Sequence, residues 1–117
     1  MYEICKRLQI SASHRLTLPY ESKCSNLHGH NWDIAIYASA GELNAQGMVY
    51  DFAALKKLIT DELDHKDITE LIRLNGKCVN PTAEHIARYI AEKVGPTCDR
   101  VEVRESDGNT AIWRADR

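Results

Sequence analysis

The chain has 117 residues and a formal net charge of −2. This length predicts a single domain, residues 1–117, with a modest hydrophobic core. So small a charge gives no positive field for nucleic acid, and no apolar run approaches the roughly 20 residues that cross a bilayer. The first seven residues contain no apolar signal segment. We therefore expect a cytoplasmic protein without nucleic-acid or membrane partners.

Two strands are predicted by alternating polarity in residues 2–14 and 28–38. In both segments the even positions are mostly apolar and include the histidines, and in the first segment the odd positions are mostly polar. If the strands pair as an antiparallel hairpin, His14 ends the first strand where His28 and His30 begin the second. Alternation alone therefore predicts that three imidazoles meet at one end of the sheet.

These three histidines have the pattern of a metal site. His28 and His30 flank Gly29, so in an extended segment both rings project from one face. With His14 they would form the three-histidine set of a catalytic Zn²⁺, whose fourth position stays open. Cys24, in the long loop before His28, is spaced as a reactive group beside that metal. Two alternatives stay open: Cys24 as a fourth ligand of a closed structural site, and histidines that line a polar sheet end without metal.

The other cysteines, Cys5, Cys78 and Cys98, make an even total of four. An even count is compatible with disulfides, but without a secretory signal that interpretation is weak. We expect these three residues to be free thiols in buried or half-buried positions.

Two helices are expected in the middle of the chain. Asp51 is a good N-cap for the first, which carries one apolar stripe and ends near residues 63–65. The second starts at residues 80–82, with Pro81 suited to its first turn, and residues 95–96, Gly-Pro, stop it.

A second pair of strands, residues 101–105 and 110–114, is expected around a turn. The order strand, strand, helix, helix, strand, strand predicts an α+β fold, with both helices on one face of an antiparallel sheet. The unpaired edges of so small a sheet favour pairing between subunits, so we expect a homo-oligomer.

Glu105 follows Val101 and Val103 on the inward row of its strand. A carboxylate there needs hydrogen-bond donors, which a ligand with amine and amide N–H groups would supply. The alternative is a register shift of one residue, after which Glu105 would pair with Arg104 or Arg114 at the surface.

Six segments together resemble the 6-pyruvoyl-tetrahydropterin synthase / 6-carboxy-tetrahydropterin synthase family, and they span nearly the whole chain in the family's order. They are Ser11-Ala12-Ser13-His14-Arg15-Leu16, Cys24-x-x-x-His28-Gly29-His30-Asn31-Trp32, Gly47-Met48-Val49-x-Asp51-Phe52-x-x-Leu55-Lys56, Leu63-Asp64-His65, Asn80-Pro81-Thr82-Ala83-Glu84 and Val101-x-Val103-x-Glu105-Ser106. Ile10 departs from the family pattern, in which an aromatic is common there. The three-residue gap between Cys24 and His28 is similar to the bacterial 6-carboxy-tetrahydropterin synthases of queuosine biosynthesis, whereas animal-type pyruvoyl enzymes usually have a longer gap.

The resemblance implies the tunnelling (T-) fold, in which subunits join their sheets into a barrel. It implies a trimer, or a hexamer built from trimers, with active sites at subunit interfaces. The implied activity is a zinc-dependent lyase that converts 7,8-dihydroneopterin triphosphate to 6-carboxy-5,6,7,8-tetrahydropterin, acetaldehyde and triphosphate. Two alternatives are elimination of triphosphate to give 6-pyruvoyl-tetrahydropterin, and a non-catalytic zinc-stabilised module.

The resemblance also implies roles for single residues. His14, His28 and His30 hold Zn²⁺, Cys24 is the general base, and Asp64 with His65 forms a second proton-transfer unit, within one subunit or between two. The pterin ring is seated by Glu105, Thr82 and Glu84, and the candidates for binding the triphosphate are Arg15 and Lys23. The plainer alternatives are a polar helix end for Asp64-His65 and a simple helix cap for Thr82.

Overall fold

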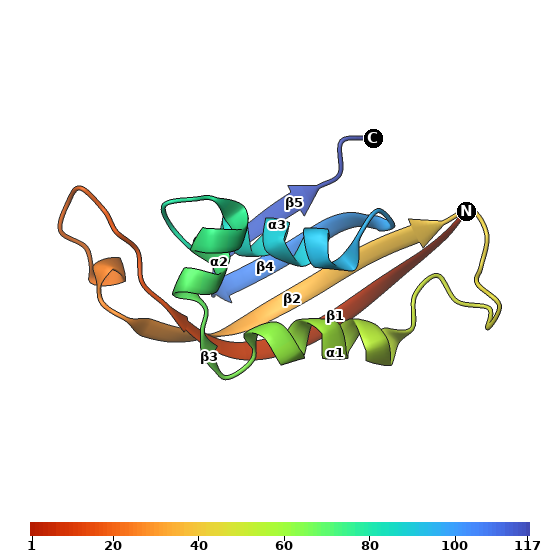
Figure 1. The fold of residues 1–117 in the computed structure, drawn as a ribbon, viewed down its shortest axis with the longest axis horizontal. Helices are drawn as coiled ribbons and strands as arrows, with labels where there is room; N and C mark the ends of the chain where they lie inside the picture. The colour runs from red at the N-terminus through yellow and green to blue at the C-terminus, as the bar shows by residue number, and fades with distance from the viewer.

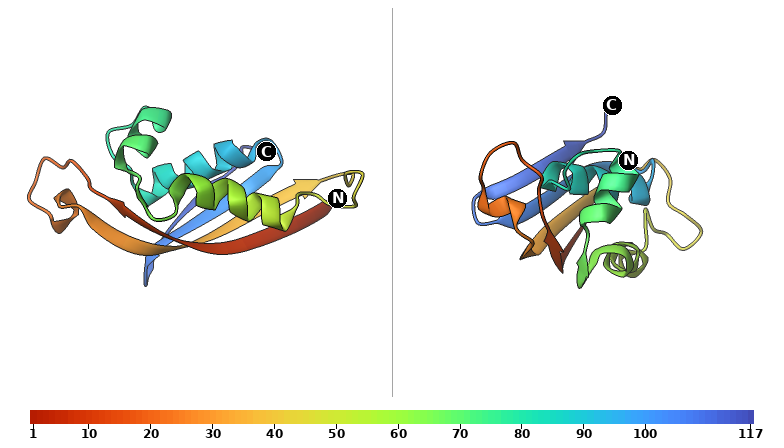
Figure 2. Two further views of the ribbon diagram at one scale, coloured as in Figure 1. Left: turned by 60° about the horizontal axis from the view of Figure 1, so that its bottom comes forward. Right: turned by 60° about the vertical axis from the view of Figure 1, so that its left-hand side comes forward.

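The structure, a computed structural model, covers residues 1–117 and consists of one five-stranded sheet with helices on one of its faces (Figures 1 and 2). The strand order is β3-β1-β2-β4-β5. The strands are β1 (Tyr2–His14), β2 (His28–Ala40), β3 (Lys66–Asp67), β4 (Cys98–Ser106) and β5 (Asn109–Arg114). The helices are α1 (Phe52–Leu63), α2 (Thr69–Gly76) and α3 (Ala83–Val94), and a 3₁₀ turn, η1, spans Lys23–Ser25. The predicted α+β class is confirmed.

The long hairpin of β1 and β2 forms in the register that alternation predicts. Antiparallel pairing runs without a break from Tyr2 opposite Ala40 to His14 opposite His28. The even residues face the helices and form much of the core, with Ile10 and Trp32 at most 1% exposed. The connecting loop extends beyond the end of the sheet (Figure 1). Both strands therefore deliver their histidines to the same end of the molecule.

Helix α1 begins as predicted, because the Asp51 carboxylate accepts hydrogen bonds from the backbone N–H groups of Ala53 and Ala54. Helix α3 begins later than predicted. Thr82 is its N-cap and accepts from the His85 N–H, so helical geometry starts only at Ala83. Pro81 therefore lies before the helix and not in its first turn, which leaves its carbonyl free to accept a side-chain hydrogen bond.

One edge of the sheet differs from the prediction. Strand β3 pairs parallel to β1 through Ala12 and Ser13, so the sheet is mixed and not wholly antiparallel. Helix α2 follows directly and was not predicted, since its eight residues carry only a short apolar stripe around Ile72. Together with Ile68 of the preceding turn, Ile72 is buried in the core.

All four cysteines are free, as expected. Cys98 is buried and Cys78 is half-buried, and burial raises the pKa of the Cys98 thiol. Cys5, in contrast, is exposed, because it lies on the odd, outward-facing row of β1.

The sheet stays open in this chain. Strand β3 covers β1 only at Ala12 and Ser13, and β5 has a neighbour on one side only. Most of one edge of β1 and the whole outer edge of β5 therefore lack a strand partner. None of the three helices is long and apolar enough to cross a membrane.

Candidate metal centre and active site

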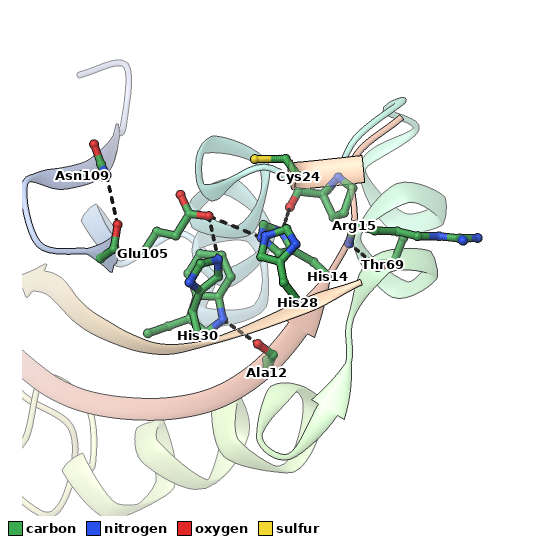
Figure 3. A network of polar contacts seen from close by, with 12 residues as sticks. Ala12, His14, Arg15, Cys24, His28, His30, Thr69, Glu105 and Asn109 are labelled. Atoms are coloured by element: carbon green, nitrogen blue, oxygen red, sulfur yellow. Dashed lines mark hydrogen bonds and ion pairs between the residues drawn. The ribbon is translucent and has the colours of Figure 1, made fainter. Parts of the chain in front are cut away.

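The imidazoles of His14, His28 and His30 converge at the end of the β1–β2 hairpin (Figure 3). The ring centroid of His14 lies 4.6 Å from that of His28 and 5.3 Å from that of His30, and the centroids of His28 and His30 are 4.9 Å apart. The convergence predicted from alternation is confirmed.

Backbone carbonyls fix the tautomers of two of these rings. His14 Nδ1 lies 2.8 Å from the carbonyl oxygen of Pro81, and His28 Nδ1 lies 2.6 Å from that of Asn26. Because a carbonyl only accepts, each neutral ring must carry its hydrogen on Nδ1. The Nε2 atoms are then unprotonated and free to bind a metal, which is the usual arrangement around metal-ligating histidines.

Trp32 supports the same cluster from below. It is fully buried, and its indole Nε1 donates to the carbonyl of Ala12 at 3.1 Å. Its ring packs edge-on against both His14 and His30, with centroids 5.0 Å away in each case. The indole therefore limits how far these two imidazoles can rotate.

Glu105 brings a carboxylate to the three rings. Its Oε1 lies 2.9 Å from His30 Nε2 and 3.4 Å from His14 Nε2. The side chain is aimed there from a β-bulge, since Arg104 pairs with Thr110 and Ser106 with Asn109, which leaves Glu105 without an opposite residue. Its ionic partners are these imidazoles, so the alternative of a surface pair with Arg104 or Arg114 is wrong.

The four donor atoms fit a metal ion. They lie within 4.8 Å of one another, and ligand atoms around a tetrahedral zinc with bonds of about 2.0–2.1 Å are roughly 3.3–3.4 Å apart. The Nε2 atoms of His14 and His30 are buried and make no hydrogen bond, although the carboxylate is close. The pKa of His30 is lowered, first by burial and then by the neighbouring imidazoles of His14 and His28, although Glu105 raises it. The unprotonated Nε2 of His14 and the carboxylate that faces it would both be satisfied by a cation bound between them.

Cys24 lies in η1, on the loop that joins β1 to β2, and is half-buried. The Ser22 hydroxyl accepts its backbone N–H, and its own carbonyl accepts from Leu16 N–H across the loop. The fourth member of the donor cluster is Glu105 and not Cys24, which weighs against Cys24 as a ligand of a closed site.

Asp64 and His65 contact each other within one chain. Asp64 is the C-cap of α1 and His65 follows with φ of +58°, a sharp turn that brings His65 Nδ1 to 3.1 Å from Asp64 Oδ2. The other oxygen, Oδ1, accepts from Ser11 N–H at 2.8 Å, and His65 N–H donates to Ser11 O. The His65 side chain is 81% exposed and makes no hydrogen bond or ion pair with the three histidines, although His65 and His30 both line an open pocket of about 450 Å³. The pair therefore closes a helix end and also presents an imidazole to the surface.

A pocket of about 420 Å³ adjoins the cluster, and Glu105 forms part of its wall. Glu84, from the first turn of α3, and Asn109, from the tip of the β4–β5 hairpin, also line it. Thr82 caps α3 immediately before this wall and is not itself part of the lining. The structure thus brings Glu84 and Glu105 together and leaves Thr82 adjacent to them.

Several supporting groups have no signature in the sequence. The carbonyls of Asn26 and Pro81 are backbone atoms, and the bulge at Glu105 depends on how β5 pairs. The position of Trp32 could be predicted, because it lies on the same even row of the strand as His28 and His30. The side chains of Arg15 and Lys23 are exposed and form no ion pair in this chain.

Comparison with known proteins places these features in context. The sequence model of the 6-pyruvoyl tetrahydropterin synthase family matches residues 3–116. The chain is 30% identical over 124 residues to the 6-carboxy-5,6,7,8-tetrahydropterin synthase of Bacillus subtilis, with 97% of this chain and 85% of that one covered. Identity to the Synechocystis protein of that name is 32% over 129 residues, covering 100% and 96%. Identity to the human 6-pyruvoyl tetrahydrobiopterin synthase is 33% over 135 residues, covering 97% and 92%.

Solved structures agree with the fold. The 6-pyruvoyl tetrahydropterin synthase of Caenorhabditis elegans has a TM-score of 0.74 at 27% identity, with 98% of this chain and 96% of that chain covered. The Plasmodium falciparum 6-pyruvoyl tetrahydropterin synthase has a TM-score of 0.65 at 18% identity, covering 97% of each, and supports the fold alone.

Proposed function

Because this chain belongs to the 6-pyruvoyl tetrahydropterin synthase family, we propose that it is a zinc-dependent lyase acting on 7,8-dihydroneopterin triphosphate. Its products are 6-carboxy-5,6,7,8-tetrahydropterin, acetaldehyde and triphosphate. This reaction is a step of queuosine biosynthesis. The observation that carries the proposal is the convergence of His14, His28 and His30, with Nε2 atoms free, beside the pocket that Glu105 and Glu84 line. The likeness to the Bacillus subtilis and Synechocystis proteins supports this choice of product.

The three histidines would hold Zn²⁺ through neutral imidazoles. The metal supplies Lewis acidity toward the hydroxyls of the substrate side chain, which makes the neighbouring protons easier to remove. Cys24, on the loop that leads into His28, then serves as the general base.

Asp64 and His65 form the second proton-transfer unit. The pKa of Asp64 is lowered, first by the hydrogen bond from Ser11 N–H and then by His65. An ionised Asp64 holds His65 Nδ1 in place, which orients an imidazole that can accept and return protons.

The pterin ring is bound in the pocket beside the cluster. Its 2-amino and ring N–H groups present two parallel donors, which a carboxylate such as that of Glu105 can accept together. Glu84 lines the same wall, and Thr82 positions that wall by capping α3.

The second candidate is a 6-pyruvoyl-tetrahydropterin synthase, in which triphosphate is eliminated and the side chain is kept. This candidate stays open because the chain is 33% identical to the human 6-pyruvoyl tetrahydrobiopterin synthase. Its identity to the 6-carboxy-5,6,7,8-tetrahydropterin synthases of Bacillus subtilis and Synechocystis, 30% and 32%, is nearly the same.

The test is to assay the purified protein for metal, incubate it with 7,8-dihydroneopterin triphosphate and identify the products by mass spectrometry. We expect 6-carboxy-tetrahydropterin together with acetaldehyde. Formation of 6-pyruvoyl-tetrahydropterin without acetaldehyde would favour the second candidate. Absence of turnover in a protein with bound zinc would contradict both and favour a non-catalytic module.

A further inference from the structure

The Glu105 carboxylate is bound on one side only. The two close partners of its Oε1 are His30 Nε2 and His14 Nε2, and no group outside the histidine cluster donates a hydrogen bond to it. Its side chain is 28% exposed, so solvent reaches part of the carboxylate, while Oε1 faces the unprotonated Nε2 of His14 at 3.4 Å. Two lone pairs that face each other repel unless a cation lies between the carboxylate and the imidazole.

The other three donors are held in place by the fold. His14 and His28 are tied through Nδ1 to backbone carbonyls, and His14 and His30 pack against the fully buried Trp32. Glu105 has no such anchor, because it is the unpaired residue of a bulge beside the β4–β5 turn. Of the four donors, the carboxylate is therefore the one that can leave.

A pocket next to the donor cluster can accommodate the Glu105 carboxylate after it leaves the metal. It belongs to the wall of the pocket of about 420 Å³ that Glu84 and Asn109 line with it. Its carboxylate thus lies on the boundary between the donor cluster and the space that receives the pterin in the proposed function (Figure 3).

We propose that Glu105 is a displaceable fourth ligand of the metal. In the substrate-free protein its carboxylate completes the set formed by His14, His28 and His30, and a site with four protein ligands is closed. A pterin ring in the adjacent pocket offers two N–H donors and draws the carboxylate away, which opens one coordination position. This inference rests on the proposed function for the identity of that ring. It makes ring binding and the binding of an external metal ligand mutually favourable.

The first measurement is metal affinity, which needs no turnover. We expect Glu105→Gln to weaken Zn²⁺ binding roughly tenfold or more in a chelator competition, because it replaces a charged ligand by a neutral amide. Glu102→Gln is the matched control, since Glu102 lies on the same strand, pairs with Arg100 at 3.0 Å and is outside the donor cluster. Equal Zn²⁺ affinity in the two variants would overturn the proposal.

The second measurement uses the unmutated protein and so does not depend on how a variant folds. In the Co²⁺-substituted protein, azide binding is followed by the visible absorption spectrum, with and without unsubstituted pterin. We expect pterin to tighten azide binding about fivefold or more, and Glu105→Gln to bind azide tightly without pterin. Azide binding that pterin leaves unchanged or weakens would overturn the proposal. A protein that passes both tests but does not turn over the triphosphate would retain the displaceable ligand and lose the proposed function.

Discussion

At the scale of single residues, the chemistry of the cluster depends on which ring nitrogen carries the hydrogen. The carbonyls of Pro81 and Asn26 hold that hydrogen on Nδ1 of His14 and His28. A metal ion then binds at Nε2 without displacing a proton from a neutral ring. The histidines are thus prepared for a ligand role by backbone atoms that belong to the loop before β2 and to the segment before α3.

The pKa of Asp64 leads to a prediction on stability at low pH. A carboxyl whose pKa is lower in the folded than in the unfolded state stabilises the fold above the unfolded pKa, and this contribution is lost as pH falls through the folded pKa. Asp64→Asn keeps an oxygen for Ser11 N–H but removes the charge. We expect the variant to have a lower free energy of unfolding than the wild type near neutral pH. This difference should not change with pH until about pH 4, and it should shrink below that.

Urea unfolding of both proteins between pH 3 and pH 7 measures this difference, with Asp61→Asn as the control at an exposed carboxylate of the same helix whose partner is Lys57. A gap of the same size at pH 3 and pH 7 would show that the Asp64 charge does not stabilise the fold.

Residue identities and alternation were sufficient to predict the histidine cluster, because burial of both even rows puts His14, His28 and His30 on one face and excludes a slip of one residue. The same rule placed Glu105 on the inner face. It did not predict that the carboxylate reaches the imidazoles, because that depends on the bulge opposite Asn109 and on the twist of the sheet. The functional roles of Cys24 and the Asp64-His65 pair stay predictions.

At the scale of elements, long periodic segments were predicted and short ones were not. Helix α1 and strands β1 and β2 have 12 or 13 residues each and clear patterns. Helix α2 has eight residues, its N-cap Ile68 makes no side-chain hydrogen bond, and it ends at Lys77 in the left-handed region, where glycine would be the usual signal. Strand β3 has two residues, which is too few to show a period. Both depend on tertiary contacts with β1 and the core.

The two N-caps allow a prediction that separates stability from substrate binding. Thr82 caps α3 beside the pocket, whereas Asp51 caps α1 away from it. We expect Thr82→Ala and Asp51→Ala each to lower the free energy of unfolding by about 1 kcal/mol. Only Thr82→Ala should also raise KM for the pterin triphosphate, because only that cap positions Glu84 and Ala83 in the pocket wall.

Chemical unfolding and steady-state kinetics on the two variants measure these effects. Thr82→Ser, which keeps the capping oxygen, should restore both stability and KM. Equal KM values for the alanine variants would reduce Thr82 to a structural cap.

At the scale of the whole molecule, the open sheet and the location of His65 point to one arrangement. Most of one edge of β1 and all of the outer edge of β5 lack a partner strand, and unpaired edges of this length invite pairing with another copy. His65 lies at the β1 edge, with its side chain 81% exposed and without a hydrogen bond or ion pair to the histidine cluster of its own chain. An edge-paired oligomer would therefore allow His65 of one copy to approach the cluster of its neighbour.

That arrangement predicts complementation between two inactive variants. Cys24→Ala removes the proposed base, which should lower turnover by about 100-fold or more while zinc is retained, since Cys24 is outside the donor cluster. His65→Ala should also be inactive. If each site takes Cys24 from one subunit and His65 from another, then unfolding and refolding an equal mixture should restore about a quarter of wild-type turnover, because both intact residues meet at one site in four. If both residues come from the same subunit, the refolded mixture stays inactive, and light scattering on the same sample shows whether the oligomer has reassembled.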